Sequence, residues 1–405
     1  MTLLLVVSLV AALVASAVVT RIVRDLALHY DRVDRPDERK KHVQAVPRVG
    51  GVGIATGAAV GLGVLVLGAA WAGIRLPLAP LMPVVAGAAG VFALGLWDDI
   101  AAVGFKVRFV VQAGIAWVMT LAGWHVDLSN VPLVEHLGVF EQAAISVPLT
   151  VLWTVGLINA MNLLDGLDAL AGGTALIGFA ALALAFSPAA DVVLFAICAL
   201  GAGGVLGFLV FNRHPASIFM GDGGSTLLGF LLAMAGIRGV SEMPSGGLVI
   251  LPVVALGLPI LDTLTTMIRR MVDGNSPFLP DADHLHHRVL ERNRDVRMAV
   301  AKMHLAAVIF GGLAVALRFV AGQPGQQALV LLVTAVFAYA LVRRLGYVRT
   351  RDIVSFLRRR LERGVRRRMV RRLRTQLARE AELRRTHTLS GDGAAVALPQ
   401  IDAPS

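Results

Sequence analysis

Cysteine and charged residues are both scarce in this chain of 405 residues. Cys198 is the only cysteine and lies inside an apolar run, which excludes an internal disulfide and a cysteine-based metal site. Charged residues make up 16% of the sequence and hydrophobic residues 56%, which excludes an ordinary water-soluble domain. No internal repeat is evident, which argues against a repeat architecture. The composition is typical of a polytopic membrane protein.

The apolar residues fall into eleven runs, each long enough to cross about 30 Å of hydrocarbon as a helix. The runs lie near residues 2–20, 50–70, 81–97, 107–124, 144–158, 169–186, 190–211, 223–239, 248–268, 302–321 and 326–344. The fifth run is short and could begin a few residues earlier. The first run lacks a basic leading region, which favours a retained helix over a signal peptide. We therefore predict an all-α fold with about eleven transmembrane helices, in which Pro148 and Pro259 are tolerated.

The basic residues predict the orientation of these helices. An odd number of spans puts the two chain ends on opposite sides of the membrane. With the N-terminus outside, all but three of the 38 lysines and arginines fall on inward segments; the exceptions are Arg75, Arg238 and Arg318. The bias persists when the long C-terminal segment is left out. We therefore predict a C-terminus in the cytoplasm and a location in the plasma membrane.

Three regions follow from the distribution of apolar and basic residues. Residues 1–345 are predicted to form the membrane domain, 346–385 a basic amphipathic cytoplasmic helix, and 386–405 a disordered tail. Apolar residues recur every fourth position from Ile353 to Leu377 among many arginines, which favours binding to anionic inner-leaflet lipids. A solvated, partly helical extension is the alternative. Nucleic acid is not an expected partner, because basic inner segments already follow from the topology.

Four polar motifs end or interrupt the apolar runs, and the predicted topology puts all four on the cytoplasmic side. Charged groups near hydrocarbon cost roughly 2.5–3.5 kcal/mol each, so such clusters indicate a site for a metal, an ion or a polar substrate. The motifs are Asp98-Asp99, Asn159-x-x-Asn162-x-x-Asp165-Gly-x-Asp168, Gly221-Asp222-Gly-Gly-Ser225 and His284-Leu-His286-His287-Arg288. The predicted convergence of four motifs on the cytoplasmic face is stronger evidence for such a site than any single motif.

The first two motifs supply carboxylates and amides. Adjacent acids on a helix cannot both point at one spot, so one of Asp98 and Asp99 is expected at a metal or a proton and the other at a neighbour. Lys106 and Arg108 follow closely; they either hold an anionic group or only obey the inside-positive bias. The oxygens of the second motif suit Mg²⁺, which prefers hard oxygen ligands and bridges phosphates. Hydrated helix ends are the structural alternative.

The last two motifs combine a carboxylate, glycines and imidazoles. Asp222 stands among glycines at a helix start, where backbone N–H groups can bind phosphate and the acid its Mg²⁺; a simple helix cap is the alternative. The histidine motif with Arg288 suits a diphosphate or a sugar hydroxyl, and zinc is disfavoured beside that guanidinium. A solvated loop is the alternative here. Asp262, inside the ninth run, receives no role.

The order and content of these motifs resemble the polyprenyl-phosphate N-acetylhexosamine-1-phosphate transferases, the superfamily that includes MraY, WecA and TagO. The resemblance runs from about residue 30 to about residue 300 and includes Pro47-Arg48-Val49-Gly50-Gly51. It implies transfer of a sugar 1-phosphate from a UDP-sugar to polyprenyl phosphate, with release of UMP and dependence on Mg²⁺, Mn²⁺ being the alternative ion. This is the first membrane step of cell-envelope polysaccharide synthesis. A homodimer is compatible with the resemblance.

Carried over position by position, the resemblance implies a role for each motif residue. It makes Asp222 the principal Mg²⁺ ligand, Asn162 a second candidate ligand, and Asp98, Asp99 and Asp165 catalytic. The residues implied at the substrates are Lys106, Arg108, Asn159, Asp168, Asn212, His284, His286, His287 and Arg288. The histidine pattern is similar to that of the WecA and TagO branch, which favours UDP-N-acetylglucosamine as donor. A phospho-muramoyl-pentapeptide donor, as in MraY, or another N-acetylhexosamine stays open, as does direct attack versus an aspartyl intermediate.

Two functions from other classes compete with this interpretation. A proton- or sodium-coupled transporter would place acids near the middle of the bilayer, whereas nearly all of them here stand at the ends of apolar runs. A membrane scaffold that recruits partners through its arginine-rich segment would leave the acidic motifs unexplained.

Overall fold

The computed structural model describes residues 1–31, 46–128, 131, 134, 136–187, 191–242, 249–272 and 285–344. All of them except Val272 belong to one compact unit, Met1–Met271 with Ser276–Tyr347. A second unit consists of Val272–Asn275 and Val348–Ser405. The amphipathic helix and the tail predicted for residues 346–405 therefore lie outside the described residues.

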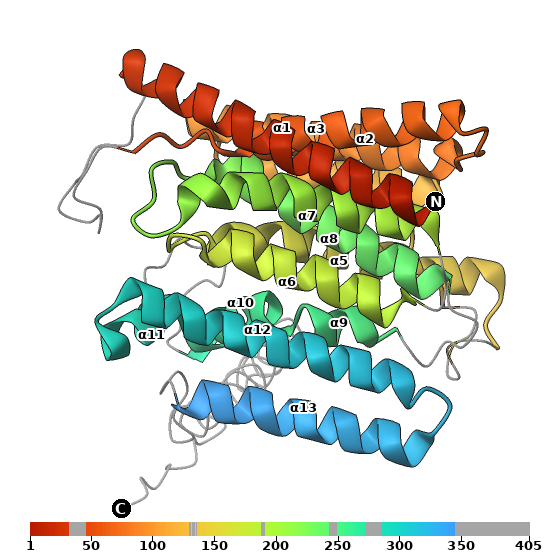
Figure 1. The fold of residues 1–405 in the computed structure, drawn as a ribbon. Coiled ribbons are helices and arrows are strands. Elements are labelled where there is room, and N and C mark those ends of the chain that lie inside the picture. The colour runs from red at the N-terminus through yellow and green to blue at the C-terminus, as the bar shows by residue number, and fades with distance from the viewer. Residues whose placement is uncertain are drawn as a thin grey trace, which may run out of the picture. The chain divides into compact units, whose positions relative to one another are not determined.

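The described residues form α-helices and no β-strand (Figure 1). The helices are α1 (Thr2–His29), α2 (Gly51–Trp71), α3 (Leu78–Ala101), α4 (Phe105–Leu121), α5 (Val139–Leu164), α6 (Leu170–Ala185), α7 (Val192–Asn212), α8 (Gly221–Ser241), α9 (Leu251–Ala255), α10 (Gly257–Val272), α11 (Leu285–Asn293), α12 (Val296–Phe319) and α13 (Pro324–Arg344). Each predicted apolar run coincides with one of these helices, or with α9 and α10 together. The fifth, α5, begins at Val139.

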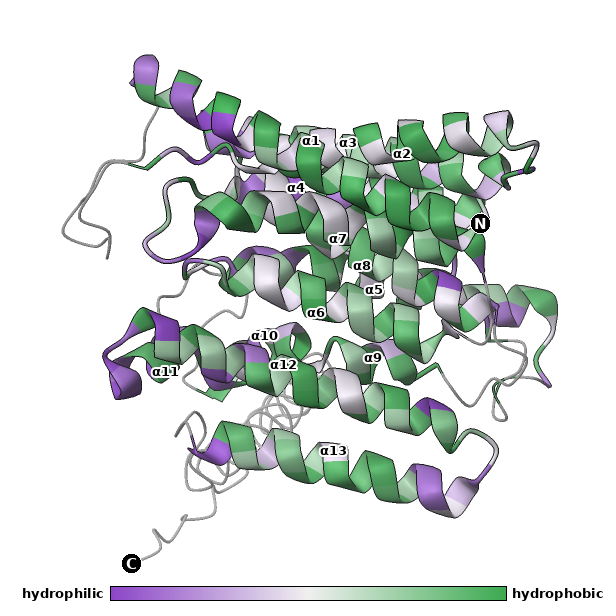
Figure 2. Cartoon of the chain, in the orientation of Figure 1, coloured by the Kyte–Doolittle hydropathy of each residue, from purple (hydrophilic) through white to green (hydrophobic). Residues whose placement is uncertain are grey.

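Eight of the described helices are long and apolar enough to cross a membrane: α1, α2, α3, α5, α7, α8, α12 and α13. A further apolar helix, α6, has 16 residues. Figure 2 shows hydrophobic residues along the lengths of these helices, with hydrophilic residues gathered toward their ends. The prediction of a polytopic all-α membrane protein is confirmed, while the count of eleven spans stays a prediction.

The run expected to form the ninth span is interrupted in its middle. Helix α9 ends at Ala255 and α10 begins at Gly257. Pro259 has no N–H group, so the carbonyl of Ala255 has no partner four residues on, and the proline ring crowds that carbonyl. One proline thus accounts for the division of this segment into two helices. In α5, by contrast, the helix continues through Pro148.

Helix α8 lies at the centre of the first unit. It packs against α2, α3, α5, α6, α7 and α9, and 89% of its most apolar window is buried inside the protein, compared with 17% for α1 and none for α13. In Figure 1 it runs behind α7 and among the other helices. Any side chain in the first turn of α8 is therefore surrounded by the ends of several neighbours.

Candidate active site

The start of α8 is held by the segment that precedes α2. Phe219 donates its backbone N–H to the carbonyl of Pro47 at 2.8 Å, and Gly50 donates to the carbonyl of Phe219 at 2.9 Å. Gly221 follows with a φ of +74°, and a Cβ there would lie 2.3 Å from the carbonyl oxygen of Arg48. Only glycine fits this approach without strain. The segment from Pro47 to Gly51 and the motif that begins at Gly221, both part of the family resemblance, are thus in direct contact.

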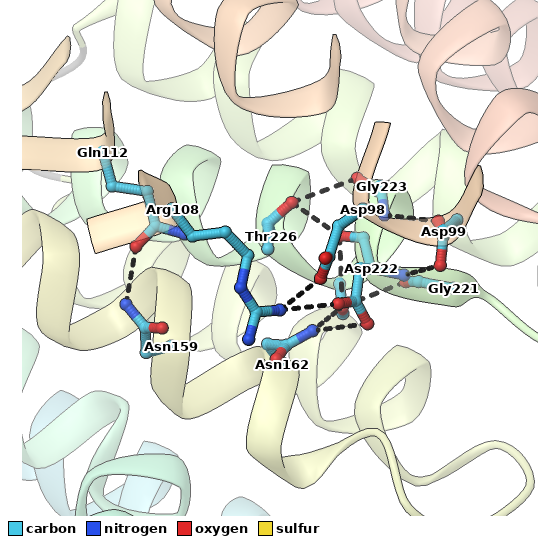
Figure 3. A network of polar contacts seen from close by, with 11 residues as sticks. Asp98, Asp99, Arg108, Gln112, Asn159, Asn162, Gly221, Asp222, Gly223 and Thr226 are labelled. Carbon is cyan, nitrogen blue, oxygen red and sulfur yellow. Dashed lines mark hydrogen bonds and ion pairs between the residues drawn. The ribbon is translucent and has the colours of Figure 1, made fainter. Parts of the chain in front are cut away.

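Asp99 anchors the first turn of α8 to the end of α3. Its Oδ1 accepts the backbone N–H of Asp222 at 2.8 Å, and its Oδ2 accepts that of Gly223 at 3.0 Å (Figure 3). These N–H groups have no partner inside their own helix. The sequence left open a phosphate or a simple helix cap at this helix start; at these two positions the partner of the N–H groups is the carboxylate of Asp99.

Asp98 points into the site instead and shares a guanidinium with Asp222. Arg108, from the first turn of α4, donates through Nη1 to Oδ2 of Asp98 and, at 2.9 Å, to Oδ2 of Asp222 (Figure 3). Two carboxylates this close repel each other unless a positive charge lies between them. The adjacent acids therefore divide their work as the sequence predicts: Asp99 binds a neighbouring helix and Asp98 faces the cluster.

Asn162 completes this cluster from the last turn of α5. Its Nδ2 donates to Oδ1 of Asp222 at 3.0 Å and to the hydroxyl of Ser225 at 3.1 Å. Four helices, α3, α4, α5 and α8, thus each place a polar side chain at one point. Lys106 is exposed and takes no part in this network.

Asn159 lies one turn earlier on α5 and has a different partner. Its Nδ2 donates to Oε1 of Gln112 at 2.7 Å, and Gln112 is only 2% exposed. Sequence reasoning did not single out Gln112. The signal that could have found it is its position four residues after Arg108, on the same face of α4 within an otherwise apolar run.

Asp165 ends α5 and is half-buried. Burial, together with the negative charge of Asp222, raises the pKa of its carboxyl to about 7, against the opposing effect of Arg48. A carboxyl with this pKa is partly protonated near neutral pH. Such a group can accept or release a proton in the pH range in which cells work.

Asp168 and Asn212 connect the loop after α5 to the loop after α7. Oδ2 of Asp168 lies 2.6 Å from Nδ1 of His214 and accepts the backbone N–H of Ala216 at 3.1 Å. Asn212 is buried; its Oδ1 accepts the N–H of Ala169 at 2.9 Å and its Nδ2 donates to the carbonyl of Ile218 at 2.9 Å. Both residues therefore position these two loops relative to each other.

The histidine motif begins α11, and His284 lies outside the described residues. His286 is 1% exposed, and its Nδ1 lies 3.7 Å from Oδ2 of Asp262, which is fully buried. Oδ1 of Asp262 accepts the backbone N–H of Leu285 at 2.7 Å. A Cβ on Gly166 would lie 2.3 Å from Nε2 of His286, so the imidazole packs directly against the loop after α5.

Asp262 thereby gains a structural role that its sequence position did not reveal. It holds the first turn of α11 to α10, and through His286 it fixes α11 against the Asp165 loop. The rings of His287 and His286 are in contact, with centroids 4.3 Å apart and planes tilted by 49°, and His287 and Arg288 are half-buried. The fourth motif is therefore brought to the same end of the bundle as the other three.

The cluster around Asp222 has the donor set that Mg²⁺ prefers. Carboxylate oxygens of Asp98 and Asp222, the amide of Asn162 and the hydroxyl of Ser225 are hard oxygen donors, once the Asn162 amide turns its oxygen toward the ion. No group of three or more His, Cys, Asp or Glu side chains in the described ranges is arranged to hold a metal. Two carboxylates still fit Mg²⁺, because this ion keeps several waters and takes phosphate oxygens as ligands.

Comparisons with known proteins identify the family of this chain. Residues 81–240 match the model of glycosyl transferase family 4, a range that contains three of the four motifs. The chain is 34% identical over 314 residues to a probable undecaprenyl-phosphate N-acetylglucosaminyl 1-phosphate transferase of Bacillus subtilis, covering 78% of this chain and 85% of that protein. It is 36% identical over 340 residues to a decaprenyl-phosphate N-acetylglucosaminephosphotransferase of Mycolicibacterium smegmatis, covering 78% and 82%.

A third relative extends the comparison. The chain is 31% identical over 327 residues to an undecaprenyl-phosphate alpha-N-acetylglucosaminyl 1-phosphate transferase of Salmonella typhi, covering 78% of this chain and 84% of that protein. The fold and the site define a multi-pass membrane transferase. More specifically, the chain belongs to glycosyl transferase family 4, among the polyprenyl-phosphate N-acetylhexosamine-1-phosphate transferases that its motifs resemble.

Proposed function

We propose that this protein transfers N-acetylglucosamine 1-phosphate from UDP-N-acetylglucosamine to a polyprenyl phosphate, with release of UMP. The observation that carries the proposal is the meeting of Asp98, Arg108, Asn162 and Asp222, from four helices, at the buried start of α8. The names of the relatives favour N-acetylglucosamine over a muramoyl-pentapeptide donor.

The reaction exchanges one phosphoanhydride bond for another. An oxygen of the lipid phosphate attacks the phosphorus that bears the sugar, and the bond from that phosphorus to the UMP oxygen breaks. Phosphoryl transfer of this kind depends mainly on positioning and on neutralising charge. The Arg108 guanidinium is placed to bind a phosphate oxygen while Asp98 orients it. Whether an aspartate first forms a covalent intermediate is left open.

Asp222 and Asn162, with Asp98, are the residues that would hold Mg²⁺. When bound, this ion neutralises the diphosphate of the donor and polarises its oxygens. Asp99 keeps the backbone of Asp222 in place through the first turn of α8, so the carboxylate stays aimed at the cluster. Asp165, with its raised pKa, is placed to accept a proton beside that cluster.

The orientation proposed for this enzyme puts the site on the cytoplasmic face of the plasma membrane. The ends of α3 and α5 and the starts of α4, α8 and α11 all contribute to it, and the lysine and arginine bias assigns that side to the cytoplasm. A water-soluble nucleotide sugar and a lipid phosphate would meet there. The acids also lie at the ends of helices, which disfavours a transporter with acids at the midplane.

The test uses the full-length protein, purified in detergent with UDP-N-acetylglucosamine, polyprenyl phosphate and Mg²⁺. We expect a lipid-linked product and stoichiometric UMP, and a loss of at least roughly 1,000-fold in Asp222→Ala, as is typical when a metal ligand and its charge are removed. Asp25→Asn, at an exposed acid of α1, is the matched control and should keep full activity.

Two results would contradict the proposal. One is the absence of lipid-linked product across a panel of UDP-N-acetylhexosamines. The other is full turnover in Asp222→Ala. The cation is tested separately. Removing Mg²⁺ with EDTA should abolish turnover, and adding Mn²⁺ afterwards should restore part of it.

A further inference from the structure

A cavity of about 780 Å³ lies beside the site and is not used by the proposed reaction. Its walls come from the C-terminal ends of α1 and α7, the loop after α7 and the first turns of α12. This volume is in the range of pockets that bind small molecules. All of its lining residues are among those that the structure describes.

Positive charge predominates in this cavity. Arg24, Arg213 and Arg297 line it, although Arg24 is paired with Asp25 at 2.7 Å, and the only acid in its wall is Asp168, which is paired with His214 at 2.6 Å. Arg297 donates through Nη2 to the carbonyl of His214 at 3.3 Å, which places its guanidinium next to the loop after α7. An anion that entered the cavity would therefore meet an excess of guanidinium groups.

One wall of the cavity is apolar and open toward the surroundings of the helices. Val210 on α7 is 52% exposed, and Phe211 beside it lies under the guanidinium of Arg24, 5.2 Å from ring centroid to guanidinium carbon. Val296 and Val300 continue this wall on α12. Figure 2 shows α1 changing from hydrophobic to hydrophilic residues toward its C-terminal end, where this cavity lies. With the predicted topology, this position corresponds to the level where acyl chains meet headgroups.

We propose that this cavity binds the headgroup of an anionic phospholipid, with Arg213 and Arg297 on its phosphate and Val210 and Val300 against its first methylene groups. Basic pockets between transmembrane helices on the cytoplasmic side are suited to such lipids. Asp168, which the family resemblance implies at the substrates, belongs to the same wall. A bound lipid would therefore touch the loop after α5, which begins with Asp165, without entering the cluster at Asp222.

The experiment measures lipid retention, not turnover, so its outcome is separate from that of the proposed transferase reaction. The full-length protein is reconstituted in nanodiscs of phosphatidylcholine with 10 mol% phosphatidylglycerol, released into the gas phase and examined by native mass spectrometry. We expect one phosphatidylglycerol to remain bound to the wild type. In Arg213→Gln/Arg297→Gln, its retention should fall about 10- to 30-fold, given the contribution of each arginine near a membrane surface.

The control removes the same charge from the same end of the bundle, outside the cavity. Arg21→Gln/Arg292→Gln changes two exposed arginines, on α1 and α11, that do not line it. Retention at wild-type level in this control, with loss in the cavity variant, supports the proposal. Equal retention in both variants, equal retention of phosphatidylcholine, or displacement of the lipid by UMP would overturn it, the last by showing that the cavity belongs to the nucleotide.

Discussion

At the residue scale, the positive charge of Arg108 allows the carboxylates of Asp98 and Asp222 to lie close together. Arg108→Gln removes the guanidinium between Asp98 and Asp222 while keeping much of its length. Hydrogen bonds to charged groups contribute roughly 1.5–3 kcal/mol, so we expect kcat/KM to fall about 100-fold, measured by UMP release. Arg108→Lys should recover part of the loss, since one ammonium cannot make both contacts in the same geometry. Unchanged kcat/KM in Arg108→Gln would exclude this role.

Asp165 should make the folded protein less stable as the pH rises, whereas an ion-paired acid makes it more stable. Its folded-state pKa of about 7 lies above the usual 3.8, so the folded protein binds more protons than the unfolded chain between these values. The metal-free wild type should therefore lose stability as the pH rises from about 4 to about 7, and change little from this cause above pH 7. In Asp165→Asn the fall in stability over this range should be smaller, because the contribution of Asp165 is removed. Melting curves in EDTA, recorded by tryptophan fluorescence across this range, measure the difference; parallel curves would contradict it.

The residues at the cluster were predictable from sequence, but their partners were not. Carboxylates and amides at the ends of apolar runs indicate a polar site, and the order of the motifs resembles that of a known family, so Asp98, Asn162 and Asp222 were predicted from the motifs together with the resemblance. The contact of Asp99 with the N–H groups of α8, and that of Gln112 with Asn159, join residues far apart in the chain. Sequence periodicity shows which face a residue occupies and does not show which helix lies opposite.

At the scale of elements, α11 depends on close packing against the loop after α5. Gly166→Ala would place a Cβ 2.3 Å from Nε2 of His286, a ring that is only 1% exposed. Overpacking of this kind costs roughly 1–3 kcal/mol, so we expect a lower melting temperature together with reduced turnover. Gly156→Ala, in the middle of α5, meets nothing within 4 Å and is the matched control, expected to be neutral or slightly stabilising. Equal effects of the two substitutions would show that His286 can move freely.

The helices themselves follow closely from the apolar runs, because a segment inside hydrocarbon must satisfy its own backbone. The division into α9 and α10 did not follow, since hydropathy continues across residues 248–268 without a signal. The break can be predicted only by noting that Pro259 has no N–H to donate to the carbonyl of Ala255, four residues earlier. Asp262 lies three residues after this proline, on α10, and there it accepts the backbone N–H of Leu285 at the start of α11.

At the scale of the whole molecule, the single cysteine allows a direct test of orientation. Cys198 is buried in α7, and a Cys198→Ser background leaves no other thiol. In right-side-out vesicles, a membrane-impermeant maleimide should label Arg75→Cys, in the turn between α2 and α3. It should label Ser217→Cys, in the loop after α7, only after the vesicles are opened. The reverse pattern would place the site outside the cell and exclude a cytoplasmic nucleotide sugar as donor.

The enclosure of α8 has a consequence for how this enzyme tolerates different membranes. Helices such as α1 and α13 are exposed along most of their length, so we expect them to tilt when the surrounding acyl chains become shorter or longer. Asp222 is insulated from that adjustment by the ring of helices around α8 and by the carboxylate of Asp99. The spacing between the reacting groups is thus set by protein packing and not by bilayer thickness, and the same catalytic distances should hold in thin and thick bilayers alike.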